Sequence, residues 1–175
     1  MIRRPPRSTL DRSSAASDVY KRQKEKFPSL GNEVTITEEM CDLNGHMNVI
    51  YYAQIFEDEF PFYSNLGFNS DYFKEGYSFF TLEMNIRYLK EMKKGETALP
   101  CFRYFAIKPK LIHYGGVILN ESGEVSAITE NVLVNVDMST RRSCEMKDEM
   151  IQHLNGMLDE HSATGEVDFE LRLKI

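Results

Sequence analysis

Residues 42–52 read Asp42-Leu43-Asn44-Gly45-His46-Met47-Asn48-Val49-Ile50-Tyr51-Tyr52 and place a carboxylate, a glycine, an imidazole and an amide just before an expected helix. Asn48 is a favourable N-cap for that helix. The apolar residues that follow recur at helical spacing: Val49, Tyr52, Ala53, Phe56, Phe60 and Tyr63. We predict a helix running to about Leu66, with Gly67 as its stop and Pro61 kinking it or ending its regular part. Because the stripe is mostly aromatic, we expect this helix to be buried against a sheet.

Extended segments lie on both sides of this helix. The expected strands are residues 33–37 before it and 77–92, 97–107, 111–119 and 124–138 after it, and turn residues separate the last four. Residues 147–159 show helical spacing, and residues 167–175 alternate strictly between apolar and charged, which predicts a half-buried C-terminal strand. The order predicts an α+β fold in which an antiparallel sheet wraps around one long helix.

Composition excludes several classes of protein. The 175 residues suit one domain, and the apolar runs are too short to span a bilayer. A net charge of -6 argues against general binding to nucleic acid or anionic membranes. Three cysteines without a CxxC pair indicate neither a disulfide framework nor a zinc site and fit a cytoplasmic protein. The four histidines show no ligand spacing, so we predict no metal.

Residues 1–23 differ in composition from the rest of the chain. They are rich in Arg and Ser and lack the apolar run of a secretory signal. This segment resembles translated sequencing-adapter sequence, and we interpret it as a disordered or non-native leader rather than a basic interaction tail. The functional domain is therefore expected within residues 24–175.

The segment before the helix can carry chemistry. A helix N-terminus presents free N–H groups and a positive dipole end, which can hold a developing oxyanion. Asp42 can act as nucleophile or general base, and Gly45 lets a substrate approach the backbone closely. In the purely structural alternative, Asn48 caps the helix, Asp42 makes an Asx turn and His46 is a solvated loop residue. Cys41 is interpreted as a small buried side chain rather than a nucleophile.

The pattern D-x-x-G-H-x-N followed by a Tyr-containing helix resembles the hotdog-fold thioesterases of the 4-hydroxybenzoyl-CoA thioesterase type, over about residues 30–145. Residues 80–91, 110–114 and 134–142 resemble the subgroup found beside, or fused to, carnitine dehydrogenases. The resemblance implies hydrolysis of a small acyl-CoA thioester, such as one like betainyl-CoA. It implies no cofactor, because coenzyme A is part of the substrate. It also implies a homodimer or homotetramer with the active site at the subunit boundary.

Site residues follow from the resemblance position by position. Asp42 matches the catalytic carboxylate, Gly45 and His46 match the loop lining the thioester carbonyl, and Asn48 matches the first Asn of H-x-N-N, whose second Asn is Val49 here. The expected substrate contacts are Tyr51, Tyr52, Tyr88 and His113, with Lys108, Lys110, Arg141 and Arg142 for the phosphates of CoA. Other hotdog enzymes use a carboxylate of the central helix. Glu57 is the candidate for that role, although its acidic run is interpreted as a solvated face.

Three other functions stay open at this point. They are release of acyl groups from acyl carrier protein, non-catalytic binding of acyl-CoA, and a purely structural role in an assembly. The acyl group is equally open, because it depends on which aromatic side chains point inward. A quaternary ammonium group would suit an aromatic-lined pocket through cation–π attraction.

Overall fold

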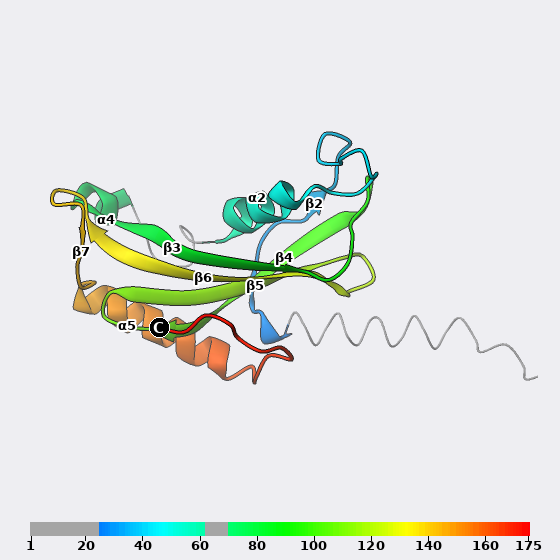
Figure 1. Cartoon of the computed structure of the whole chain (residues 1–175). Coiled ribbons are helices and arrows are strands. Elements are labelled where there is room, and N and C mark those ends of the chain that lie inside the picture. Colours follow the sequence, from blue (N-terminus) through cyan, green and yellow to red (C-terminus); the bar gives the residue numbers. More distant parts are fainter. Residues whose placement is uncertain (1–24, 62–69) are drawn as a thin grey trace, which may run out of the picture.

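The computed structural model describes residues 25–61 and 70–175. The elements in chain order are β1 (Ser29–Leu30), β2 (Val34–Thr35), α2 (Val49–Glu59), α4 (Ser70–Lys74), β3 (Tyr77–Tyr88), β4 (Thr97–Ile107), β5 (Leu111–Leu119), β6 (Val125–Asp137), β7 (Arg142–Ser143) and α5 (Asp148–Ser162). The expected leader lies outside the described residues, as does the part of the predicted central helix beyond Pro61. The predicted order of helix and antiparallel strands is confirmed (Figure 1).

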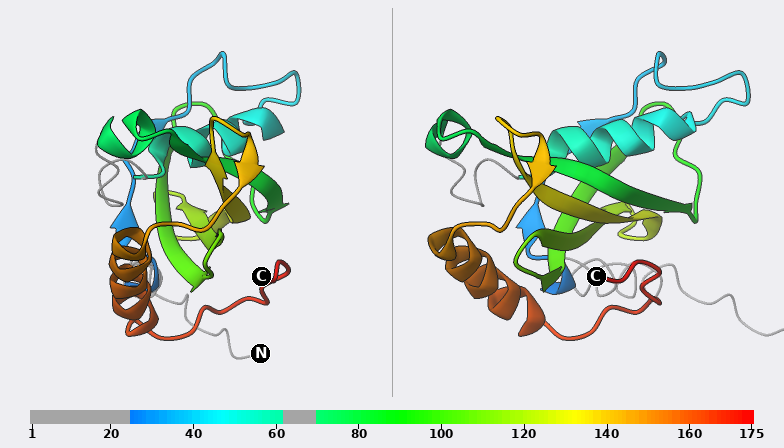
Figure 2. Two further views of the ribbon diagram at one scale, coloured as in Figure 1. Left: turned by 90° about the vertical axis from the view of Figure 1, so that its left-hand side faces the viewer. Right: turned by 60° about the vertical axis from the view of Figure 1, so that its left-hand side comes forward.

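One antiparallel sheet forms the centre of the molecule. Its strand order is β1-β4-β5-β6-β3, and the short strands β2 and β7 pair with β4 and β6. The helix α2 lies along one face, and α5 lies on the other side of the sheet against β4 (Figures 1 and 2). At one edge β3 pairs with β6, and within the described residues its other edge pairs with no strand. A register shift between Thr81 and Glu83 marks a bulge on this edge strand.

The regular part of the central helix ends just before Pro61, which is one of the two outcomes predicted for this proline. It ends at Glu59 because Pro61 disfavours helical geometry at the preceding residue, and Phe60 is extended with ψ 118°. Its buried side chains are Tyr52, Ile55 and Phe56. The predicted stripe is therefore correct in its middle and wrong at its start, where the side chain of Val49 is 53% exposed.

The last ten residues do not form the predicted strand. Residues 166–175 are irregular, yet their burial still alternates, with Leu173 only 7% exposed. The alternation arises because the segment lies along the sheet face opposite α2, where Val167 and Phe169 pack around Phe27 and neighbouring strand residues. Among the described helices, none is long and apolar enough to cross a membrane.

Candidate active site

The loop before α2 is a closed turn rather than a loose connection. The N–H of Asp42 donates to the carbonyl of His46 at 3.0 Å, and the N–H of Gly45 donates back to the carbonyl of Asp42 at 2.9 Å. Gly45 has φ +80°, a conformation that an L side chain rarely adopts, and no atom lies near the position of a Cβ there. The turn therefore leaves open space directly beside its backbone.

The carboxylate of Asp42 organises this turn. One oxygen accepts the backbone N–H of Asn44 at 2.8 Å, and the other accepts its side-chain amide at 3.3 Å. This is the Asx turn of the structural reading, and the side chain is half-buried. The neighbouring Cys41 thiol donates to the carbonyl of Thr37 at 3.4 Å, so it points into local structure rather than toward His46.

The start of α2 supplies an unused donor. Asn48 caps the helix as predicted, since its side-chain oxygen accepts the N–H of Ile50 at 3.1 Å. Tyr51 N–H is bound to the carbonyl of Asn48 at 3.0 Å. Within residues 25–61 and 70–175, the backbone N–H of Val49 makes no hydrogen bond. It therefore lies at the positive end of the helix dipole, available to an oxyanion.

A cleft of about 240 Å³ opens at this helix start. Its lining residues are His46, Met47, Val49, Tyr52, Tyr88, Leu89, Lys90 and Glu91. The structure thus brings the predicted residues His46, Tyr52 and Tyr88 together. The rings of Tyr52 and Tyr88 meet edge to face with centroids 5.2 Å apart, and the Tyr52 hydroxyl donates to the carbonyl of Lys90 at 3.3 Å. Burial raises the pKa of Tyr52, so its phenol stays neutral at pH 7.

The other predicted substrate contacts lie elsewhere in the chain. Tyr51 is half-buried and packs against the core rather than lining the cleft. Lys108 and Lys110 lie in the β4–β5 turn, Arg141 lies in the β6–β7 turn, and Arg142 begins β7. These turns are at the opposite end of the sheet from His46, which bridges to Lys93 just before β4. One chain alone does not place these cations near the cleft.

His113 does not face α2. Its neighbours Ile112 and Tyr114 pack into the core that contains Tyr52 and Phe56, so alternation along β5 turns His113 to the opposite face. There it is 3% exposed, with Nε2 3.6 Å from the carboxylate of Glu130. Burial lowers its pKa despite that carboxylate. The expectation that His113 contacts the acyl group within one chain is therefore not supported by its position.

A second cleft, of about 210 Å³, lies at the far end of α2. It is lined by Glu57, Asp58, Phe60, Phe79, Thr81, Tyr114 and Leu133. The rings of Phe60 and Tyr114 stack in parallel with centroids 4.1 Å apart. Although Glu57 retains solvent access, desolvation by surrounding protein raises its pKa, and Asp58 adds to the effect. Sequence reasoning assigned Glu57 to a solvated face and missed this cleft, because strands distant in sequence build its other wall.

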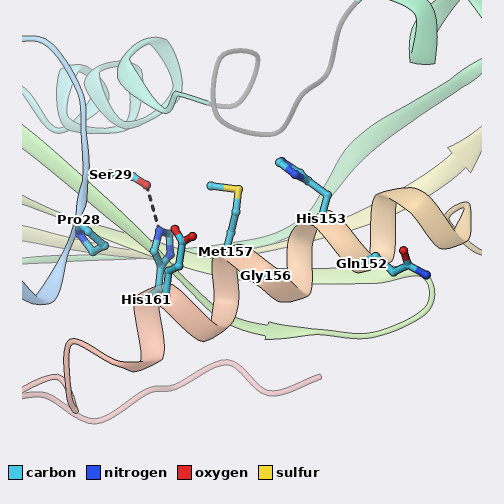
Figure 3. Close-up of a pocket in the computed structure, with 8 residues that line it drawn as sticks. Pro28, Ser29, Gln152, His153, Gly156, Met157 and His161 are labelled. Carbon is cyan, nitrogen blue, oxygen red and sulfur yellow. Dashed lines mark hydrogen bonds between the residues drawn. The ribbon is translucent and has the colours of Figure 1, made fainter.

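A wider cleft of about 570 Å³ follows α5 on the other side of the sheet and contains a Ser–His pair (Figure 3). Nε2 of His161 lies 3.3 Å from the hydroxyl oxygen of Ser29. The N–H of Tyr104 donates to Nδ1 of the same ring at 2.9 Å, so the neutral ring carries its proton on Nε2 and donates to Ser29. This ring therefore cannot take a proton from the serine, and the pair is structural. The His161 side chain is buried, with only 4% of its surface exposed.

An antiparallel sheet around a central helix, with a cleft at the helix start, defines the hotdog class of thioesterase folds. The chain belongs to the thioesterase-like superfamily, whose family model matches residues 35–154. It is 31% identical over 147 residues to the L-carnitine dehydrogenase/betainyl-CoA thioesterase of Agrobacterium fabrum. The matched region covers 79% of this chain and 30% of that protein. It is 25% identical over 134 residues to the betainyl-CoA thioesterase of Pseudomonas aeruginosa, covering 75% of this chain and 84% of that one. The chain spans less than a third of the bifunctional relatives it matches.

Solved structures show the same fold. The DHNA-CoA thioesterase of Staphylococcus aureus superposes with a TM-score of 0.69 at 19% identity, over 79% of this chain and 96% of that chain. A hypothetical protein of S. aureus in complex with CoA gives a TM-score of 0.68 at 22% identity, over 84% and 94% of the two chains. The predicted hotdog fold is therefore confirmed.

Proposed function

We propose that the protein hydrolyses an acyl-CoA thioester with a small acyl group, of the betainyl-CoA kind, to the free acid and coenzyme A. The observation that carries the proposal is the start of α2, where the Val49 N–H is unpaired among the described residues and lies beyond the turn that holds the Asp42 carboxylate. The names of the family and of its curated relatives support the reaction class. The choice of betainyl as the acyl group rests at this point only on the names of these relatives.

The proposed reaction uses the Val49 N–H, the Asp42 carboxylate and the residues of the cleft at the start of α2. The thioester oxygen binds at the Val49 N–H, where the helix dipole stabilises the negative charge that develops on it. Asp42 attacks the carbonyl carbon itself or removes a proton from an attacking water. In the general-base route, the C–S bond breaks after water has added, and the acyl group keeps the oxygen of that water. In the nucleophilic route, the C–S bond breaks to leave an acyl–Asp42 anhydride, which water then hydrolyses to the free acid and the Asp42 carboxylate. In both routes the CoA thiolate takes up a proton. His46 and Tyr52 line the space beside the acyl carbon. These steps need no cofactor, because CoA enters as part of the substrate.

We further propose that the site is completed by a second copy of the chain across β3. The edge of β3 that pairs with no other strand of the described part of the chain carries Leu82, 61% exposed, and ends at Tyr88, 49% exposed. A two-fold axis at this edge would pair β3 with its copy in antiparallel fashion. The Tyr88 end of one chain would then meet the Tyr77 end of the other, whose neighbouring segments carry the basic residues described above. A homodimer of this kind, alone or doubled to a tetramer, would bring those cations toward CoA.

A thiol-release assay with a panel of acyl-CoAs tests the proposed function. We expect CoA release with the wild type and a fall in kcat/KM of about 10²–10⁴-fold for Asp42→Asn, because the amide is neither base nor nucleophile. The amide oxygen can still accept the Asn44 N–H, so the turn is expected to persist. Asp148→Asn, on the exposed start of α5, is the matched control. CoA binding without thiol release would show a binding module, and turnover of acyl carrier protein substrates alone would show the alternative thioesterase class. The three free cysteines suit a reducing cytoplasm, where we expect the protein to act.

A further inference from the structure

The cleft at the end of α2 has the composition of a cation site. It is lined by two acidic residues, Glu57 and Asp58, and by three aromatic residues, Phe60, Phe79 and Tyr114, and no described Lys or Arg lines it. Asp58 accepts the side-chain amide of Gln54 at 3.2 Å. Within the described residues, the carboxylate of Glu57 has neither an ion-pair partner nor a hydrogen bond. Such a cleft repels the phosphates of CoA and attracts a positive charge.

Aromatic faces with nearby carboxylates are the usual way to bind a quaternary ammonium group, which cannot donate a hydrogen bond. A cavity of about 150 Å³ is enough to hold benzene, so this cleft of about 210 Å³ accommodates the smaller trimethylammonium group. We propose that this cleft binds the cationic end of the acyl group and that Glu57 is the residue that selects for its charge. The inference rests on the proposed thioester hydrolysis.

Geometry decides which chain supplies the cleft. Glu57 is eight residues beyond Val49, which is about 12 Å along a helix. In a betainyl thioester the nitrogen is only two bonds from the carbonyl carbon, so the cleft of the same chain is out of reach. In the dimer proposed above, antiparallel pairing of β3 with its copy would place the cleft residues Phe79 and Thr81 of one chain near the Tyr88 end of the other. The cation of a thioester held by Asp42 is therefore received by Glu57 of the second copy.

A pair of isosteric substrates isolates the charge. Betainyl-CoA and 3,3-dimethylbutyryl-CoA differ by one nitrogen in place of carbon, and so by one positive charge. We expect the wild type to favour betainyl-CoA in kcat/KM by at least about tenfold, and Glu57→Gln to reduce this ratio by about tenfold. The exposed Glu149→Gln on α5 makes the same chemical change and is expected to leave the ratio as in the wild type.

The possible outcomes separate a failure of the charge-selecting role of Glu57 from a failure of the proposed thioester hydrolysis. Hydrolysis of neither substrate would contradict the proposed function. Equal hydrolysis of both would leave that function standing and overturn the charge-selecting role. If Glu57→Gln lowered kcat/KM for both substrates to the same extent, this carboxylate would act in the chemical step instead, and the inference would again be overturned. One measurement uses the wild type alone, so it does not depend on a variant that folds. Free betaine should inhibit acyl-CoA hydrolysis at a lower concentration than 3,3-dimethylbutyrate does. Equal inhibition by the two would count against a cation site in the cleft at Glu57.

Discussion

Glu130 on β6 accepts the backbone N–H of Leu173 at 3.0 Å, and the same oxygen accepts the N–H of Arg172 at 2.8 Å. Its other carboxylate oxygen pairs with the guanidinium of Arg87 on β3 at 3.1 Å. The Glu130 side chain is fully buried. One carboxylate thus neutralises a cation of the edge strand and fixes the C-terminal segment to the sheet.

Removal of this carboxylate should be costly. Glu130→Ala leaves the Arg87 charge and two backbone N–H groups without their acceptor, and breaking a buried ion pair in this way typically costs about 3–5 kcal/mol. We expect a fall of that size in the free energy of unfolding measured with urea, together with faster proteolysis after residue 165. Glu170→Ala, an exposed acid in the same segment, is the control and should change stability by less than about 0.5 kcal/mol. Equal effects of the two substitutions would contradict the role of Glu130.

In the C-terminal segment, the sequence pattern predicts the burial of the side chains but not the pairing of the backbone. Strict alternation correctly predicted which side chains of residues 167–175 face the protein. It did not predict that a carboxylate, rather than a neighbouring strand, would take the backbone N–H groups of Arg172 and Leu173. Alternation reports which side of the chain is buried, whereas strand pairing depends on a free strand edge nearby, which the local sequence does not reveal.

The stability of the protein should fall as the medium becomes mildly acidic because of His161. Burial and the nearby Arg103 charge lower its pKa from 6.5 to about 4. Between these values the unfolded chain binds a proton that the folded chain does not, so stability is lost as pH falls from about 6.5 to 4. The loss from this group is about 3 kcal/mol, and His113, whose pKa is also lowered, adds in the same direction.

His161→Gln tests this assignment, because glutamine keeps an acceptor for the Tyr104 N–H but does not titrate. We expect urea unfolding of the variant to depend less steeply on pH between 6.5 and 4 than that of the wild type. Gln152→Ala, at an exposed position of the same helix that carries no titratable group, should keep the wild-type slope. Indistinguishable slopes for wild type and His161→Gln would show that the ring is protonated in the folded state.

The candidate site was predictable from sequence only in part. The Asp42–Asn48 turn, the helix cap and the cleft residue His46 follow from local patterns, because turns and caps are set by residues close together in the chain. The face on which His113 lies depends on the register of β5 within the sheet. The cleft at Glu57 needs β3, β5 and β6 to converge on the end of α2. Such features come from pairing across the sheet, which periodicity along one segment does not contain.

Substitution by alanine should lower the stability of the protein at Gly115 and raise it at Gly156. A Cβ on Gly115 of β5 would lie 2.5 Å from the carbonyl oxygen of Thr129 and 2.7 Å from the ring of Phe105. Since the backbone atom cannot move aside cheaply, we expect Gly115→Ala to cost about 1–3 kcal/mol or more. A Cβ on Gly156 of α5 meets no atom within 4 Å, so Gly156→Ala should stabilise the helix by about 0.5–1 kcal/mol. Thermal unfolding of both variants checks this, and a stable Gly115→Ala protein would contradict the close strand contact.

Mixed dimers test whether Asp42 and Glu57 act across the subunit boundary. In a dimer of one Asp42→Asn chain and one Glu57→Gln chain, pairing between subunits yields one site with both native residues and one with neither. Such a dimer, purified with two different tags, should recover about half of the wild-type betainyl-CoA activity per dimer and the full preference over 3,3-dimethylbutyryl-CoA. If both residues served the same chain's site, no site would be intact, and activity would not exceed the mean of the two parent variants. The comparison requires that each parent form dimers by light scattering, and activity no higher than the parental mean would contradict the pairing of Asp42 and Glu57 across the subunit boundary.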